Sequence, residues 1–266
     1  MGPAEALAIF GAGGAAGAVN AVVGSGSLIT FPTLLAFGFA PVVANVSNNV
    51  GLVSGNVSGA VGYRRELAGQ RRRLIRLGVF SMAGSLAGAA ALLSLPSSSF
   101  QLIVPALILI SCALVLAQPW LSARIVARRD RRASAQGAPQ AGTAAEGAER
   151  TSPALAGGVF GAAVYGGYFG AAQGVLVIGL LGTFLDEPLQ RVNGAKNVLV
   201  AIVNGSAAVV YIIFAHVAWL VVLLIAVGST IGGLIGARYG RRLPPLALRI
   251  FVVIIGVISA VKLIFF

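Results

Sequence analysis

Residues 44–51 read ANVSNNVG, and residues 192–199 read VNGAKNVL. The two stretches lie 148 positions apart, and the same offset, without a gap, aligns further identical residues. The pairs are Gly26/Gly174, Asn45/Asn193, Asn49/Asn197, Val50/Val198, Asn56/Asn204, Ser58/Ser206, Tyr63/Tyr211, Ser81/Ser229, Gly84/Gly232, Leu86/Leu234, Gly88/Gly236, Leu95/Leu243 and Pro96/Pro244. A constant offset held over 71 residues, from Gly26 to Pro96, predicts an internal duplication, and in a hydrophobic chain two such halves commonly enclose a transport site.

The composition predicts a membrane protein. Of the 266 residues, 58% are hydrophobic and only 10% are charged. Four long runs contain no charged residue, namely 6–63, 77–123, 151–185 and 197–237. Because about 20 apolar residues cross the bilayer core, each run holds about one to three membrane segments. A water-soluble domain of this size could not bury so many helices without a polar face, so we expect an all-α, polytopic membrane protein.

Hydropathy and loop residues divide the chain into ten segments. We expect helices at 4–22, 27–39, 42–63, 76–95, 101–121, 154–169, 174–185, 189–212, 217–237 and 246–266. The second segment of each half is too short to cross and is predicted to be a broken or re-entrant helix, which gives about eight spans plus two short elements. Whether the short elements cross is left open. The first repeat then covers 1–121, a flexible basic linker covers 122–153, and the second repeat covers 154–266.

Loop charges predict that the two halves face opposite ways. The segment 64–76 is strongly basic, whereas its equivalent, 212–224, contains no Lys or Arg. Conversely, the turn at 96–101 is uncharged, whereas its equivalent at 244–249 lies beside a second arginine cluster. Because Lys and Arg concentrate in cytoplasmic loops, we expect an inverted-topology repeat with the N-terminus outside and the linker in the cytoplasm.

The net charge of +12 raises nucleic acid as a partner. The arginines, however, gather between hydrophobic segments, so any basic face would be held at the membrane surface. We therefore expect no nucleic-acid partner, and anionic lipid headgroups of the bilayer are the expected contact for these side chains.

The first candidate site is the pair of small-residue breaks that precede the two short segments. Gly24, Ser25, Gly26 and Ser27 form the first break, and Gln173 and Gly174 belong to the second. Small residues let backbone N–H groups approach a ligand, and a helix that starts there directs its positive dipole end and unpaired N–H groups at an anion. The alternative is that these glycines only permit close helix packing.

The second candidate site is a polar stripe that occurs in both halves. Its members are Asn45, Asn48, Asn49 and Asn56, with the mates Asn193, Lys196, Asn197 and Asn204. Their spacing places each set on one helix face, and polar groups inside a membrane face the protein interior or a cavity. Interhelical hydrogen bonding without a ligand is the alternative. We favour a ligand role for the first turn of each stripe and leave both interpretations open for Asn56 and Asn204.

Lys196 breaks the symmetry, because the other half has Asn48 at this position. An ammonium group there would attract an anion and could exchange a proton during transport. The alternative is that the side chain snorkels towards Asp186 and Glu187 at the nearby membrane surface.

No pattern in the sequence predicts an enzyme. His216, beside Trp219, is expected at an exposed turn, and Cys112 in an apolar stretch is expected to be a small core residue. One histidine and one cysteine cannot build the usual nitrogen and sulfur ligand set for a metal. Neither hydrolase nor nucleotide-binding motifs occur, so we expect no catalytic activity, no cofactor and no direct coupling to ATP.

The chain resembles the TauE/SafE family, also called the sulfonate uptake permease family. The resemblance covers nearly the whole chain outside the linker and is carried by these motifs: Gly24-Ser25-Gly26-Ser27, Phe31-Pro32, Ala44-Asn45-Val46-Ser47-Asn48, Tyr63-Arg64-Arg65, Gly170-Ala171-Ala172-Gln173-Gly174, Asn193-Gly194-Ala195-Lys196-Asn197 and Gly232-Gly233-Leu234-Ile235-Gly236-Ala237-Arg238 before Leu243-Pro244. Serine and glutamine stand at the breaks where the family has glycine. The resemblance implies passive or ion-coupled movement of small sulfur-containing anions such as sulfite, sulfoacetate or other sulfonates.

The combined hypothesis is a secondary transporter of the bacterial plasma membrane that works by alternating access. The small anionic solute would sit between the two breaks, lined by Asn45, Asn48, Asn49, Asn193, Lys196 and Asn197. The coupling ion, H⁺ or Na⁺, and a homo-oligomeric state are left open. The alternatives are a passive anion or metabolite channel, an intramembrane enzyme and a membrane scaffold.

Overall fold

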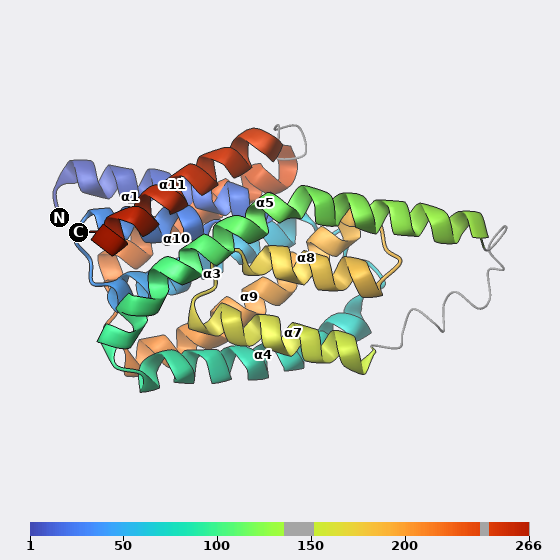
Figure 1. Cartoon of the computed structure of the whole chain (residues 1–266), viewed down its shortest axis with the longest axis horizontal. Helices are drawn as coiled ribbons and strands as arrows, with labels where there is room; N and C mark the ends of the chain where they lie inside the picture. The colour runs from blue at the N-terminus through green and yellow to red at the C-terminus, as the bar shows by residue number, and fades with distance from the viewer. Residues whose placement is uncertain (136–151, 240–244, 266) are drawn as a thin grey trace.

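The computed structural model describes residues 1–135, 152–239 and 245–265, and these residues form ten helices and no strand (Figure 1). The helices are α1 (Pro3–Val22), α2 (Ser27–Ala36), α3 (Pro41–Gly62), α4 (Arg71–Ser94), α5 (Ser97–Ala135), α7 (Pro153–Tyr168), α8 (Gln173–Phe184), α9 (Leu189–Phe214), α10 (Trp219–Tyr239) and α11 (Pro245–Phe265). Each of the ten predicted segments corresponds to one of these helices, so the all-helical prediction is confirmed.

Five helices are long and apolar enough to cross a membrane, as expected for a polytopic membrane protein. They are α1, α4, α9, α10 and the Ser97–Ala127 part of α5. Helix α3 has sufficient length, with 22 residues, but its asparagine stripe makes it more polar. Helices α2 and α8 are apolar and have only 10 and 12 residues. The predicted total of eight spans stays a prediction.

The prediction of a flexible linker over 122–153 is wrong for its first part. Helix α5 continues to Ala135, well beyond the predicted end at residue 121. Between Pro119 and Gly137 the sequence contains neither proline nor glycine and is rich in alanine and arginine, which favour helix. Residues 136–151, the rest of that prediction, lie outside the described residues.

The two halves of the chain run in opposite directions along the molecule. In Figure 1 both chain ends and the α4–α5 connection lie at the left. The end of α5, the start of α7 and the α8–α9 connection lie at the right. The first five helices therefore begin at one end of the molecule and finish at the other, and the last five return.

Helices of one half pack against helices of the other half, and equivalent helices do so in the same way. Helix α1 packs against α10, and α7 packs against α4. In the same way α3 contacts α10 while α9 contacts α4, and α2 contacts α11 while α8 contacts α5. Helices α3 and α9 contact each other. Small residues permit this packing, because a Cβ on Gly17 of α1 would lie 2.2 Å from the carbonyl oxygen of Ser229 on α10.

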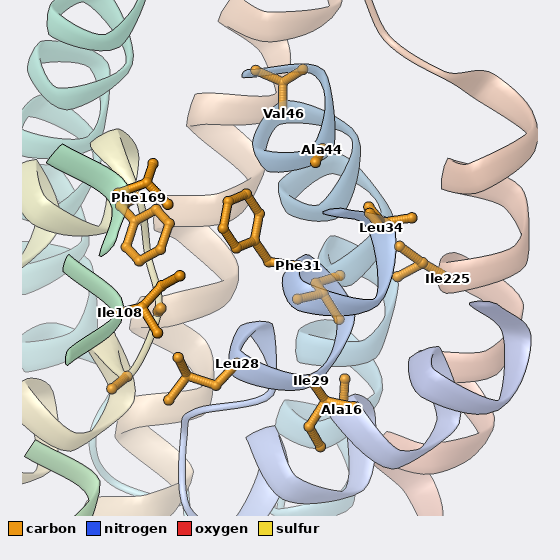
Figure 2. Close-up of a cluster of buried hydrophobic side chains, with 14 of the residues drawn as sticks. Ala16, Leu28, Ile29, Phe31, Leu34, Ala44, Val46, Ile108, Phe169 and Ile225 are labelled. Carbon is orange, nitrogen blue, oxygen red and sulfur yellow. The ribbon is translucent and has the colours of Figure 1, made fainter. Parts of the chain in front are cut away.

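An apolar cluster fills the space beside the two helix breaks. Phe31 of α2 and Phe169, directly after α7, meet edge to face with ring centroids 5.3 Å apart. Figure 2 shows these two rings facing each other, with Leu28 and Ile108 close by. The cluster joins the two halves and thereby positions the residues that follow α1 and α7.

Candidate functional site at the two helix breaks

The two breaks begin in the same way but end differently, because Gly26 before α2 has φ −58° and Ala172 before α8 has φ 57°. Helix α1 ends at Val22, and the Gly24 N–H donates to the carbonyl oxygen of Val19 at 3.1 Å. The Gly170 N–H donates in the same way to Tyr165 at 3.1 Å. Gly24 has φ +87° and Gly170 has φ +78°, a left-handed conformation that favours glycine.

This construction corrects the alignment of the breaks. The offset of 148 pairs Gly26 with Gly174. In the structure, however, Gly24 and Gly170 are the equivalent residues of the two breaks, at an offset of 146. The short helices likewise begin at Ser27 and Gln173. Because α8 has 12 residues and α2 has 10, the offset returns to 148 at the next helix. The Gly26/Gly174 pairing is therefore wrong.

The structure brings the two breaks together. The Gly174 N–H donates a 3.1 Å hydrogen bond to the carbonyl oxygen of Gly24. A Cβ on Gly24 would lie 2.6 Å from the Cα atom of Gly174, so neither position has room for a side chain. The two segments touch through their backbones, and the starts of α2 and α8 lie directly beside this contact.

Several buried polar atoms at the breaks have no hydrogen-bond partner. Ser25 and Gln173 are each only 1% exposed, yet the Ser25 hydroxyl and both amide atoms of Gln173 are unpaired. The Oδ1 atoms of Asn49 and Asn193 are unpaired as well. A buried polar group without a partner costs about 1–3 kcal/mol, so this concentration indicates a place where a bound solute or water completes the hydrogen bonds.

Lys196 binds the carboxyl end of α1. Its side chain is 0% exposed, and Nζ donates to the carbonyl oxygens of Asn20 at 2.7 Å and Ala21 at 3.1 Å. Asn197 Nδ2 also donates to Ala21, at 3.3 Å. These carbonyls are free acceptors at the negative end of the helix dipole, so a cation fits there.

The snorkelling interpretation of Lys196 is not supported. Glu187 instead forms ion pairs with Arg73, at 3.1 Å, and Arg191, at 2.6 Å. This cluster connects the start of α4 with the start of α9, while Lys196 points into the protein.

Neutral groups bind the carboxyl end of α7. Asn45 Nδ2 donates to the carbonyl oxygen of Tyr168 at 3.0 Å, and the Tyr211 hydroxyl donates to that of Gly167. The first turns of both polar stripes thus bind the helix ends that precede the breaks. This role was not predicted, because the sequence does not show which carbonyls are left free.

Other members of the stripes form interhelical hydrogen bonds. Asn48 accepts from the Thr30 hydroxyl, and Asn49 Nδ2 donates to Asn204 at 3.4 Å. Asn56 accepts from Nδ2 of Asn20 at 2.7 Å. For Asn56 and Asn204 these contacts favour the purely structural interpretation.

Asn20 is a site residue that the sequence analysis missed. Its Oδ1 accepts from the Gly26 N–H at 3.2 Å, and its backbone carbonyl accepts from Lys196. Asn20 therefore joins α1, the first break and α9. It has no polar counterpart in the second half, where the offset of 146 that holds at the breaks gives Gly166, so the search for repeated residues passed over it. An isolated asparagine four residues before a break was the available signal.

Outside the breaks, the described residues contain few metal-binding or reactive side chains. They contain no group of three or more His, Cys, Asp or Glu that could hold a metal ion. Cys112 is buried and His216 is exposed, as predicted.

Comparison with known proteins gives consistent results. The family model described as "Sulfite exporter TauE/SafE" matches residues 9–263. The chain is 24% identical over 251 residues to the "Probable membrane transporter protein YfcA" of Escherichia coli (strain K12), covering 94% of this chain and 86% of that protein. It is also 24% identical over 263 residues to a "Probable membrane transporter protein" of Haemophilus influenzae, covering 97% and 93%. No solved structure matches the chain significantly. With the family model matching almost the full length, this chain belongs to the TauE/SafE family of membrane transporters.

Proposed function

We propose that this protein is a secondary transporter that moves a small anion, sulfur-containing as in the family description, by alternating access between two inverted repeats. The anion would bind at the two helix breaks, beside Gly24–Ser27 and Gln173–Gly174. The observation that carries this proposal is the Gly24–Gly174 contact, surrounded by the unpaired polar atoms of Ser25 and Gln173. The first backbone N–H groups of α8 already donate within the protein, so the donors that suit an oxyanion here are the Ser25 hydroxyl and the Gln173 amide N–H.

The inverted-repeat part of the proposal has two independent supports. First, equivalent helices exchange partners, as in the α1–α10 and α7–α4 contacts, and the two halves run in opposite directions (Figure 1). Second, the loop charges change ends between the halves. Helices α1–α2 and α7–α8 would then be two hairpins that enter from opposite membrane faces. Sites between such broken helices are typical of secondary transporters.

The helix contacts also define the bodies that would move. Helices α1, α3 and α10 pack on one another, and so do α7, α9 and α4. Each group holds helices of both halves. In this proposal the groups rock about the Gly24–Gly174 contact, and the Arg73–Glu187–Arg191 cluster, which joins the starts of α4 and α9, stays closed within one group.

The test is transport by the purified protein in proteoliposomes, with labelled sulfite, thiosulfate, sulfoacetate or sulfate outside. We expect saturable uptake, and faster entry of labelled solute when the vesicles are preloaded with the unlabelled solute. Imposed H⁺ and Na⁺ gradients then identify the coupling ion. Uptake that neither saturates nor shows this exchange would identify a channel instead, and absence of uptake for every anion would contradict the proposal.

A further inference from the structure

A basic pocket lies at the end of the molecule where α3 finishes and α10 finishes. It has a volume of about 700 Å³ and is lined by Gly62, Arg64, Arg65, Glu66, Leu234, Ala237 and Arg238. Arg64, Arg65 and Arg238 are exposed, and within the part of the chain that the structure describes none of the three forms an ion pair. Glu66 has an interaction partner of its own. The pocket lining thus carries three arginines and one glutamate, which leaves it positively charged.

An apolar groove begins at the same arginine. The groove has a volume of about 430 Å³ and is lined by Val57, Ala60, Val61, Arg64, Leu67, Val198, Ala201 and Ile202. It lies between α3 and α9, and Val57 and Val61 are about half exposed on its wall. Arg64 lines both the groove and the basic pocket. The cationic pocket and the apolar groove thus adjoin at Arg64.

The other half of the chain provides an internal comparison. At the offset of 148, which holds for these helices, the positions of Arg64, Arg65 and Arg238 are occupied by Ile212, Ile213 and Ala90. The arginines are thus not needed for the fold of the repeat, because the equivalent position folds without them. They are confined to one end of the molecule, as expected for contact with one leaflet.

We propose that this site binds one anionic phospholipid. The phosphate lies among Arg64, Arg65 and Arg238, and an acyl chain occupies the α3–α9 groove. Guanidinium groups bind phosphate through paired hydrogen bonds, and the groove accepts a hydrocarbon chain but has no donor for a second charge. A free phosphate or the transported anion would leave the groove unfilled, which favours a lipid. Because the groove lies between helices of the two halves, the bound lipid contacts both.

Native mass spectrometry of the purified, delipidated full-length protein tests the proposal. The probes are palmitoyl-oleoyl phosphatidylglycerol, phosphatidylcholine with the same acyl chains, and glycerol phosphate. We expect one phosphatidylglycerol to bind in preference to phosphatidylcholine, and glycerol phosphate not to displace it. Arg64→Gln should weaken phosphatidylglycerol binding about fivefold, since one arginine near anionic lipid contributes about this factor. Arg64→Lys should retain most of the binding.

Arg71→Gln is the matched control, because Arg71 is an exposed arginine at the same end and does not line the pocket. Its lipid binding should equal that of the wild type. Ala201→Phe, or Ala60→Phe if the first variant does not fold, fills the groove and should reduce binding of phosphatidylglycerol. Equal losses in Arg64→Gln and Arg71→Gln would show a diffuse basic surface and overturn the proposal. Equal binding of the two lipids, displacement by glycerol phosphate, or unchanged binding in the groove variants would overturn it as well.

Discussion

The two helix breaks begin with the same kind of helix end but are bound by side chains of different charge. At both, a glycine with positive φ ends the preceding helix, and a short apolar helix follows. The carboxyl end of α1 is bound by the Lys196 ammonium, whereas that of α7 is bound by the Asn45 amide and the Tyr211 hydroxyl. The difference teaches that two similar helix ends can be bound by groups of different kinds, a lysine at one and neutral donors at the other. Under the proposed function, the balancing charge for the anion comes from one half only.

Removal of that cation should have the largest effect. Lys196→Ala deletes the ammonium and leaves the carbonyls of Asn20 and Ala21 without this donor. We expect proteoliposome uptake of a sulfonate to fall about 100-fold, as for loss of a buried charged partner worth about 3 kcal/mol. Asn48→Ala is the comparison at the equivalent position, because it removes an uncharged side chain. Wild-type uptake by a folded Lys196→Ala protein would remove the lysine from the mechanism.

The backbone contact between the breaks can be tested by a single methyl group. A Cβ on Gly174 would lie 2.9 Å from the Gly24 carbonyl oxygen, so Gly174→Ala must separate the breaks. Overpacking of this kind costs about 1–3 kcal/mol. We expect a lower thermal-unfolding midpoint in detergent, together with a smaller fall in uptake than in Lys196→Ala. Gly161→Ala has no heavy atom within 4 Å of the added group and serves as the control. Equal midpoints for the two variants would show that the contact is not rigid.

A substitution of Gln173, whose buried amide is unpaired, can separate an effect on transport from an effect on stability. Gln173→Leu replaces an unsatisfied buried amide by an apolar group of similar size, so the unfolding midpoint should stay level or rise. Uptake should nevertheless fall about tenfold, if one hydrogen bond of about 1.5 kcal/mol to the anion is lost. A variant that retains full uptake would place the solute away from the second break.

Removal of a donor from the carboxyl end of α7, which neutral groups bind, should have the smallest effect on uptake. Asn45→Ala removes one of two donors to the end of α7, while Tyr211 still binds Gly167. We expect a stability loss of about 1 kcal/mol and uptake within about threefold of the wild type. The measurement is the unfolding midpoint alongside the transport rate. Loss of uptake as large as in Lys196→Ala would mean that the two breaks are equivalent after all.

The sequence predicted the helices well because a helix inside the apolar membrane needs a long uncharged run, and loop residues separate one run from the next. It also predicted the two breaks and the buried stripes. It did not predict the end of α5, since hydropathy marks where a helix leaves the apolar region and not where the helix stops. The partners of Lys196 and the role of Asn20 depend on which helix end lies opposite which stripe. Such long-range contacts are set by packing and are not contained in a local pattern.

Helix α5 has a consequence for imaging this small protein. Its 39 residues extend about 58 Å, roughly twice the thickness of the bilayer core. In Figure 1 the last turns reach beyond every other helix. After Pro119 the helix continues without another proline or glycine, so a soluble domain joined in helical phase near Ala135 would give electron microscopists the alignment mark that membrane proteins of this size lack.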